Sequence, residues 1–274
     1  NYFEIKSKYF VLACGGIDNS RFLLKSKNLD NLLDKRLPVG NFWMGHYKVF
    51  FGELLADFSK LKKIFNVNRY INNHAILSFT ENFLTKNNIE NISVFLEPNQ
   101  LSKNKFNHVA KKILCVAPEY TRQIVELFKK KLLCGSSLEF IWGQKPNIEN
   151  KITLKKNIFD KFGIPLVDLS CNYFDDDFKA PELFLFELGK YFIDNNIGRI
   201  SITNDIFTNK NNIMWEGYHH IGGTIIGDNP NYSVVDHNLK VHNTKNLFVV
   251  GSSVFSQAGH TNPTMSIVQF SLRL

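Results

Sequence analysis

Five of the eight histidines in this 274-residue chain lie in its last fifth, and two of them, His219 and His220, are adjacent. The surrounding segment, Tyr218–Ile221, is predicted to be extended, so the two imidazoles should face opposite ways. Gly222 and Gly223 follow and permit close approach of a backbone or a ring. A neutral imidazole can remove a proton from an alcohol, which makes this pair a candidate for acid–base chemistry.

A helix entrance is the second candidate feature. The apolar run 247–250 has the length of a strand and stops at Gly251, and an apolar stripe at helical spacing follows Asn262 and Pro263. Proline suits the first position of a helix, where its missing N–H costs nothing. Asn262 should therefore lie at the helix mouth, where backbone N–H groups and the helix dipole favour negative charge.

These features occur in a fixed order that resembles a known family. The block is similar to the C-terminal signature of the glucose-methanol-choline (GMC) oxidoreductases, FAD-dependent enzymes that oxidise alcohols, and several submotifs in order are more specific than any one alone. The matching residues are His220-Ile221-Gly222-Gly223-Thr224, Val234-Val235-Asp236, Asn246-Leu247, Gly251-Ser252-Ser253 and Asn262-Pro263-Thr264.

Weaker similarity extends upstream. Residues 8–24 resemble the family's strand, glycine turn and helix, and residues 40–46 resemble its Gly-x-x-hydrophobic-Met-Asp-His segment, with Gly45 where the family has aspartate. Residues 146–150 and 160–165 resemble the start of its C-terminal module. The likeness is therefore patchy before residue 215 and dense after it.

The resemblance implies a mechanism and its residues. His220 would accept the hydroxyl proton, Asn262 would orient the developing alkoxide, and FAD would accept the hydride. The substrate would be an alcohol, possibly a sugar or other polyol, while the electron acceptor and the choice between oxidase and dehydrogenase stay open. The residues expected to bind FAD are Gly15, Gly16, Gly251, Ser252, Asn262, Pro263 and Thr264.

The family's Gly-x-Gly-x-x-Gly fingerprint does not occur in these residues. We therefore expect the chain to be the C-terminal half of a longer protein, inactive and weak in FAD binding by itself. The expected fold is mixed α/β and α+β: a partial, Rossmann-like FAD/NAD(P)-binding domain and a substrate domain with a mainly antiparallel sheet packed by helices. Residues 1–37 and 213–274 should form the flavin domain, and residues 38–212 the substrate domain.

Periodicity places the elements within this frame. An N-terminal strand (9–14) should lie in one domain with the strand at 247–250. Within the substrate domain we predict strands at 50–55, 75–79, 93–96, 137–142, 151–154 and 166–173, and helices at 120–133 and 181–195.

Two alternative functions remain open. Gly45 and the missing fingerprint favour a binding or assembly module that keeps the fold without a cofactor. A metal site is the other alternative, from His219, His220, His237, His242 and His260, but the set lacks a close His-x-x-x-His pair and nearby Cys or carboxylate spacing. Outside the motif, His220 could be structural and Asn262 a helix cap; His219 should pack beside the site, and His237 and His242 should be solvated.

Composition gives looser bounds. The net charge is +8, but the lysines are dispersed and accompany no nucleic-acid-binding motif, so no nucleic-acid partner is expected. No apolar run approaches the roughly eighteen residues of a membrane span, and no signal peptide is recognisable. The four cysteines are widely spaced, which predicts reduced thiols in a cytoplasmic protein.

Overall fold

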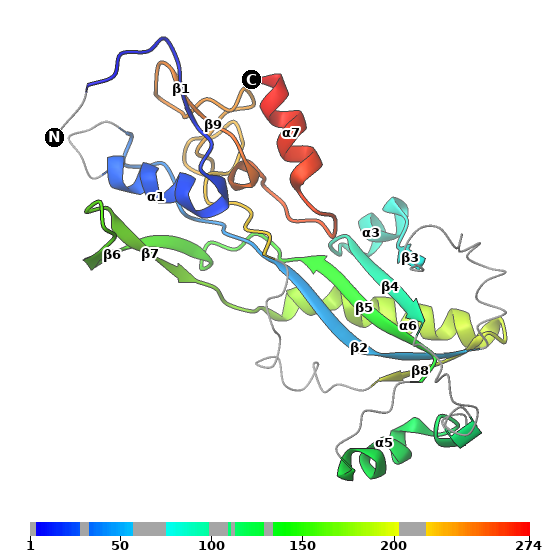
Figure 1. The fold of residues 1–274 in the computed structure, drawn as a ribbon. Helices are drawn as coiled ribbons and strands as arrows, with labels where there is room; N and C mark the ends of the chain where they lie inside the picture. Colours follow the sequence, from blue (N-terminus) through cyan, green and yellow to red (C-terminus); the bar gives the residue numbers. More distant parts are fainter. Residues whose placement is uncertain are drawn as a thin grey trace. The chain divides into compact units, whose positions relative to one another are not determined.

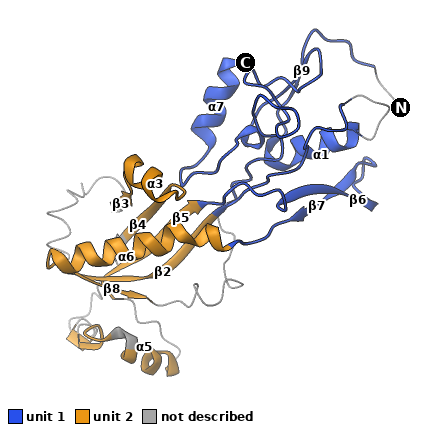
Figure 2. Cartoon of the chain, turned by 180° about the vertical axis from the view of Figure 1, so that it is seen from behind, with its two compact units in different colours: residues 1–46, 143–174, 217–274 blue, residues 47–142, 175–216 orange. Residues whose placement is uncertain are grey.

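The chain forms two compact units, each built from segments far apart in the sequence (Figure 2). The computed structural model describes residues 4–27, 33–56, 75–98, 109–110, 113–128, 134–202 and 218–274. Unit 1 comprises residues 1–46, 143–174 and 217–274, and unit 2 comprises residues 47–142 and 175–216.

Unit 1 joins the two ends of the chain through a parallel strand pair. Strand β1 (Phe10–Leu12) pairs with β9 (Leu247–Val249), with Val11 opposite Phe248. Helix α1 (Gly15–Lys27) follows β1 directly (Figure 1). The prediction that the N-terminal and C-terminal strands share one domain is therefore confirmed.

A hairpin from the middle of the chain also belongs to unit 1. Strands β6 (Lys151–Phe159) and β7 (Pro165–Ser170) are antiparallel, and Arg21 on α1 binds this hairpin. The Arg21 guanidinium donates to Pro165 O at 2.7 Å and to the Asp160 carboxylate at 2.8 Å. These contacts explain why residues 143–174 lie in unit 1, whereas the sequence placed them inside the 38–212 segment.

The core of unit 1 is aliphatic. Irregular backbone between Gly222 and Asn246 carries isolated bridges instead of long strands, and the short helix η3 (Ser252–Val254) follows β9. Helix α7 (Thr264–Arg273) contacts this core through Phe270, whose ring lies 5.5 Å from that of Phe255. The buried core members are Leu23, Leu33, Leu37, Val39, Val234, Val235, Leu239, Val241, Val249, Val250 and Val254.

Unit 2 is built on a five-stranded sheet in the order β3-β4-β5-β2-β8. The recorded registers, β3 with β4, β4 with β5 and β2 with β8, are antiparallel. Helix α6 (Lys179–Asp194) runs along this sheet, with Phe184 and Phe192 buried (Figure 1). The strands are β2 (His46–Ala56), β3 (Ala75–Ser78), β4 (Ile92–Pro98), β5 (Ser136–Gly143) and β8 (Gly198–Ile202); the remaining elements are α3 (Glu81–Asn87), α5 (Pro118–Leu127) and η1 (Asp175–Phe178).

Aromatic side chains fill the core of unit 2. Tyr47 stacks on Trp142 with ring centroids 4.7 Å apart, and Phe51 meets Phe140 edge-on at 4.6 Å. The polar ends of the first pair converge on Asp177: the Tyr47 hydroxyl donates to its carboxylate, and the Trp142 indole donates to its carbonyl oxygen. Large aromatic rings with satisfied polar ends are typical of a rigid core.

The predicted fold class is confirmed: the chain is mixed α/β with mainly antiparallel pairing. Strand β8 was not predicted, and the other strands match the predictions to within about five residues at each end. Helix α5 ends at Leu127, and residues 129–133 of the helix predicted at 120–133 lie outside the described part.

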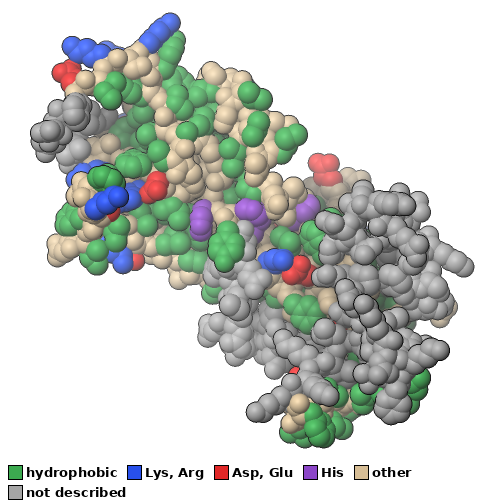
Figure 3. Space-filling view, viewed as in Figure 1, with side chains coloured by type: hydrophobic (Ala, Val, Ile, Leu, Met, Phe, Trp, Pro, Cys, Tyr) green, Lys and Arg blue, Asp and Glu red, His purple; other side chains and the backbone are tan. Residues whose placement is uncertain are grey.

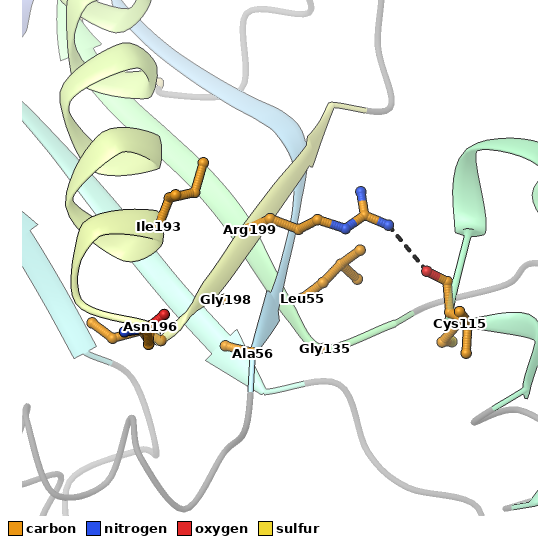
Figure 4. A pocket seen from close by; sticks show the side chains of 10 residues that line it. Leu55, Ala56, Cys115, Gly135, Ile193, Asn196, Gly198 and Arg199 are labelled. Carbon is orange, nitrogen blue, oxygen red and sulfur yellow. Dashed lines mark hydrogen bonds between the residues drawn. The ribbon is translucent and has the colours of Figure 1, made fainter.

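The cysteine prediction is wrong for one pair. Cys115 and Cys134 form a disulfide, while Cys14 is exposed and Cys171 is half-buried, both with free thiols. Sequence spacing could not reveal this bond, because folding brings a segment just before α5 close to a segment just before β5. The bond borders a cavity of about 800 Å³ within unit 2, beside which the Arg199 guanidinium donates to Val116 O at 3.1 Å (Figure 4).

Within the ranges that the structure describes, no helix combines the length and the apolar character that crossing a bilayer requires.

Candidate functional site

The adjacent histidines lie on a short segment of unit 1 that a two-bond bridge holds in place. Met44 N donates to Ile221 O at 2.8 Å, and Ile221 N donates back to Met44 O at 3.0 Å. The bridge is antiparallel, and Met44 and Ile221 are both buried. Tyr218, where the segment enters, has a left-handed φ of 47°, so the chain turns just before the histidines.

The two imidazoles face opposite ways, as predicted. The His220 ring lies against the buried Trp43 ring, with centroids 5.8 Å apart. The His219 ring instead meets His46 edge-on at 4.8 Å. Histidine side chains reach the surface close together on one face of the molecule (Figure 3).

The backbone of His220 is fixed by two residues that the sequence assigned to cofactor binding. The Ser252 hydroxyl donates to His220 O at 2.6 Å. Gly16 packs so closely that a Cβ there would collide with His220 O. In this structure both residues therefore hold the histidine segment.

The other two predicted glycines mark open or strained backbone. Gly15 has a φ of +88°, and no atom lies within 4 Å of the position its Cβ would take. Gly251, after β9, has a φ of +123°, and a Cβ there would lie 3.4 Å from the Asn19 amide nitrogen. Both conformations favour glycine.

A fully buried asparagine, Asn19, connects these turns, a role that was not predicted from the sequence. The Asn19 carbonyl oxygen accepts from Cys14 N at 2.8 Å, and its amide donates to Val250 O and to the Ser253 hydroxyl, each at 2.9 Å. The Thr224 hydroxyl donates to the same Ser253 oxygen at 2.8 Å. One side chain thus ties the end of β1, α1, the end of β9 and η3 together. Its only signal in the sequence is an asparagine at the start of a helix.

The helix entrance is placed beside the histidine segment by a small apolar cluster. Ala258 is buried against Met44 and Ile221, the same two residues that form the bridge. The chain then passes His260 and Asn262 before α7 begins at Thr264, one residue later than predicted, with Pro263 as its N-cap. Motifs about forty residues apart in sequence are therefore neighbours at this cluster.

Asn262 itself is exposed and caps nothing. No side-chain hydrogen bond is recorded at the α7 cap. Across the ranges that the structure describes, none joins Asn262 to His220. Its predicted neighbours Pro263 and Thr264 are half-buried and exposed, respectively. The first N–H groups of α7 lack helical acceptors, as at every helix start, and are available to a ligand.

Burial keeps the histidines of this region neutral at pH 7. It lowers the pKa of His46 to about 4, with smaller contributions from the charges of His219 and His260. The pKa values of His219 and His260 are lowered by burial, and that of His220 by burial and then by the charge of His219. A neutral imidazole is the form that can accept a proton.

The histidines of the alternative metal set are spread apart. The exposed His237 ring lies 3.0 Å from the Asp228 carboxylate. Nε2 of His242 lies 3.0 Å from both the Ser233 hydroxyl and Gly227 O. His242 therefore has a structural role, whereas the sequence predicted a solvated side chain. Within the described ranges, no group of three or more His, Cys, Asp or Glu side chains is arranged to hold a metal ion.

Part of the chain is similar to known proteins in sequence. Residues 146–271 match the family model described as GMC oxidoreductase. Over 128 residues the chain is 28% identical to the fructose dehydrogenase large subunit of Gluconobacter japonicus, covering 47% of this chain and 22% of that protein.

Solved structures share the fold. Pyridoxine 4-oxidase from Mesorbium loti matches 96% of the chain with a TM-score of 0.51 at 14% identity. An FAD-dependent oxidoreductase from Chaetomium thermophilum matches 98% with a TM-score of 0.54 at 13% identity. Formate oxidase from Aspergillus oryzae RIB40 matches 97% with a TM-score of 0.51 at 14% identity.

The chain spans 50%, 54% and 53% of these three solved chains, respectively. At these identities the structural likeness concerns the fold alone. The order of motifs around His220 and Asn262 agrees with the match of residues 146–271 to the family model described as GMC oxidoreductase.

Proposed function

We propose that this chain forms part of an FAD-dependent oxidoreductase that oxidises a CH–OH group. The observation that carries the proposal is the state of His220: a neutral imidazole, half-buried against Trp43, on a backbone fixed by Ser252 and Gly16. No hydrogen bond to its ring nitrogens is recorded within the described ranges, so its lone pair is available. A rigid base with an available lone pair suits general base catalysis.

The residues present fit a flat cofactor with an anionic edge. Gly15 leaves open space where a side chain would stand, and the N–H groups at the start of α7 favour negative charge. Gly15, Gly251 and the 262–264 turn would hold FAD. When bound, FAD would accept a hydride from the substrate carbon.

The protein residues then have separate tasks. His220 would take the hydroxyl proton while it is neutral. The exposed Asn262 would donate its amide N–H to the substrate oxygen as negative charge develops there. Trp43 would restrict the orientation of the base by covering one side of its ring.

Substrate class and partners are part of the proposal. Similarity to a fructose dehydrogenase large subunit favours a sugar or polyol as the alcohol. The cytoplasmic location predicted from the sequence is a weaker proposal, since the Cys115–Cys134 bond is of a kind that persists in oxidising compartments.

Anaerobic flavin reduction tests the proposal. The complete encoded protein should purify with FAD, and fructose or another polyol should bleach the oxidised flavin spectrum in a stopped-flow instrument. Protein that binds no flavin under any loading condition would instead support the cofactor-free binding module.

A further inference from the structure

The buried His46 is placed opposite His219 by strand register. Met44 and Ile221 are bridge partners in an antiparallel pairing. His46 lies two residues after Met44, and His219 lies two residues before Ile221. In an antiparallel pairing these two residues therefore lie opposite each other on the same face as the bridge. His220, one residue on, must then face the other side, where it meets Trp43.

The contact between these two imidazoles is specific. Nδ1 of His46 lies 3.0 Å from Nδ1 of His219, which is hydrogen-bond distance. His46 is 1% exposed, whereas His219 is only partly buried. Burial lowers the pKa of both rings, so both are neutral at pH 7. One of the two Nδ1 atoms must then carry the shared proton, and the other must accept it.

Burial decides which ring donates. Nε2 of His46 is buried and has no hydrogen-bond partner among the described residues. If His46 accepted, its own proton would sit on Nε2 as a buried N–H without an acceptor, an arrangement that folded proteins rarely tolerate. If His46 donates from Nδ1, its N–H is satisfied and only a bare lone pair remains on Nε2.

We propose that His46 is a positioning residue of the site: its Nδ1–H donates to Nδ1 of His219, fixes His219 as the Nε2–H tautomer, and thereby keeps His220 on the Trp43 face. The catalytic consequence rests on the proposed function, but the hydrogen bond does not. His219 then offers a donor at Nε2 and no available lone pair. Of the two adjacent histidines, only His220 can serve as the base.

Long-range proton–nitrogen NMR on the complete protein labelled with ¹⁵N-histidine tests the tautomers directly. We expect His46 to show a protonated Nδ1 and a bare Nε2. His219 should show a protonated Nε2 and a hydrogen-bonded, bare Nδ1. Loss of single resonances in His46→Asn and His219→Gln assigns them. A protonated Nε2 on His46 would overturn the proposal, and this result requires no turnover.

Two substitutions separate positioning from bulk structure. His46→Asn keeps an N–H donor near the place of Nδ1, whereas His46→Leu removes it at similar volume. We expect His46→Leu to slow flavin reduction by about 10-fold to 10²-fold at unchanged substrate affinity, because a displaced base costs rate more than binding. His46→Asn should recover most of that loss.

Equal rates in the two variants, whether normal or low, would contradict the proposal. If His46→Leu does not fold, the tautomers of the unmodified protein still decide it. If the expected tautomers are found but no alcohol reduces the flavin, the proposed function fails while the positioning role of His46 stands.

Discussion

The two units are stabilised by different means. Unit 2 rests on aromatic packing, with Trp142, Phe51 and Phe140 all fully buried across its sheet. The site region of unit 1 depends on polar contacts: Asn19, Ser253 and Thr224 are also fully buried, and hydrogen bonds connect them. Packing energy changes gradually with shape, whereas a buried hydrogen-bond network fixes positions closely.

This difference predicts which substitutions affect activity and which affect stability. Changes in unit 2 should lower stability and leave the chemical step intact in the molecules that remain folded. Changes in the polar region of unit 1 should affect both.

Removal of the base should have the largest effect. In the complete protein, His220→Ala should slow flavin reduction by about 10²–10⁴-fold, the range typical of a lost general base. Asn262→Ala should cost less, since it removes one hydrogen bond and leaves the base. Stopped-flow absorbance of the flavin under anaerobic conditions measures both.

Neighbouring histidines are the matched controls for that experiment. His219→Ala and His260→Ala should each slow flavin reduction less than His220→Ala. Normal turnover by His220→Ala together with a severe loss in either neighbour would show that the base is misassigned.

Aromatic truncation in unit 2 should cost stability. Phe140 is fully buried and contacts Phe51 and Phe184, so Phe140→Ala should lower the free energy of unfolding by about 3–5 kcal/mol. Phe186→Ala on the outer face of α6 is the control, because Phe186 is 67% exposed. Chemical denaturation followed by circular dichroism compares the two. Equal losses of unfolding free energy in the two variants would contradict the assignment of Phe140 to the core.

Loss of the Asn19 network should affect stability and activity together. Asn19→Ala removes the hydrogen bonds to Cys14 N and to the buried Val250 O, which should cost about 2–4 kcal/mol. Because Gly251 and Ser252 lie beside this network, flavin reduction should slow as well. Asn246→Ala, whose amide donates to Ser7 O and Lys8 O at the surface, is the control and should change little. Full activity in folded Asn19→Ala protein would show that the Asn19 hydrogen bonds do not position the candidate site.

Acid should destabilise unit 1 through His46. Its folded pKa of about 4 lies below the unfolded value of 6.5, so the unfolded state binds more protons between these values. The stabilising contribution of His46 is therefore fully present above pH 6.5 and is lost as the pH decreases toward 4. For this group, the free energy of unfolding should fall by about 2 kcal/mol between pH 7 and pH 5. The lowered pKa values of His219, His220 and His260 act in the same direction.

Denaturation at pH 7 and pH 5 measures this loss. His46→Asn should reduce the difference, whereas His237→Gln, at the exposed Asp228 pair, should keep it. The same pH dependence in His46→Asn as in the unmodified protein would contradict the burial argument.

The smallest expected effect is on the thiol count. Denatured, unreduced protein should show two reactive thiols, from Cys14 and Cys171, and four after reduction. Mass spectrometry of an alkylated digest identifies the linked peptides. Four reactive thiols before reduction would show that the disulfide is absent and that the reduced state predicted from the sequence is correct.

Much of the fold, and the orientation of the two adjacent histidines of the candidate site, could be predicted from local patterns. Strand and helix periodicities located most elements, including the β1 and β9 segments. The alternation of an extended strand predicted that His219 and His220 face opposite ways, because that property depends only on local geometry. Motif order predicted the family model that residues 146–271 match. The proposed roles of His220 and Asn262 remain to be tested.

Other features depend on contacts between distant residues. The sequence could not reveal that Arg21 holds the β6–β7 hairpin against α1, that Cys115 meets Cys134, or that His242 bonds to Ser233 and Gly227 O. None of these pairs follows from spacing, because each is created by the path of the chain between its members.

Local sequence patterns predict which glycines, histidines and amides belong to the candidate site and in what order they occur. Their pairing depends on the tertiary structure. The register of the Met44–Ile221 bridge sets His46 against His219, and burial then lowers the pKa values of the histidines. Register and burial are properties of chain segments in contact, so they appear only once those segments have folded together.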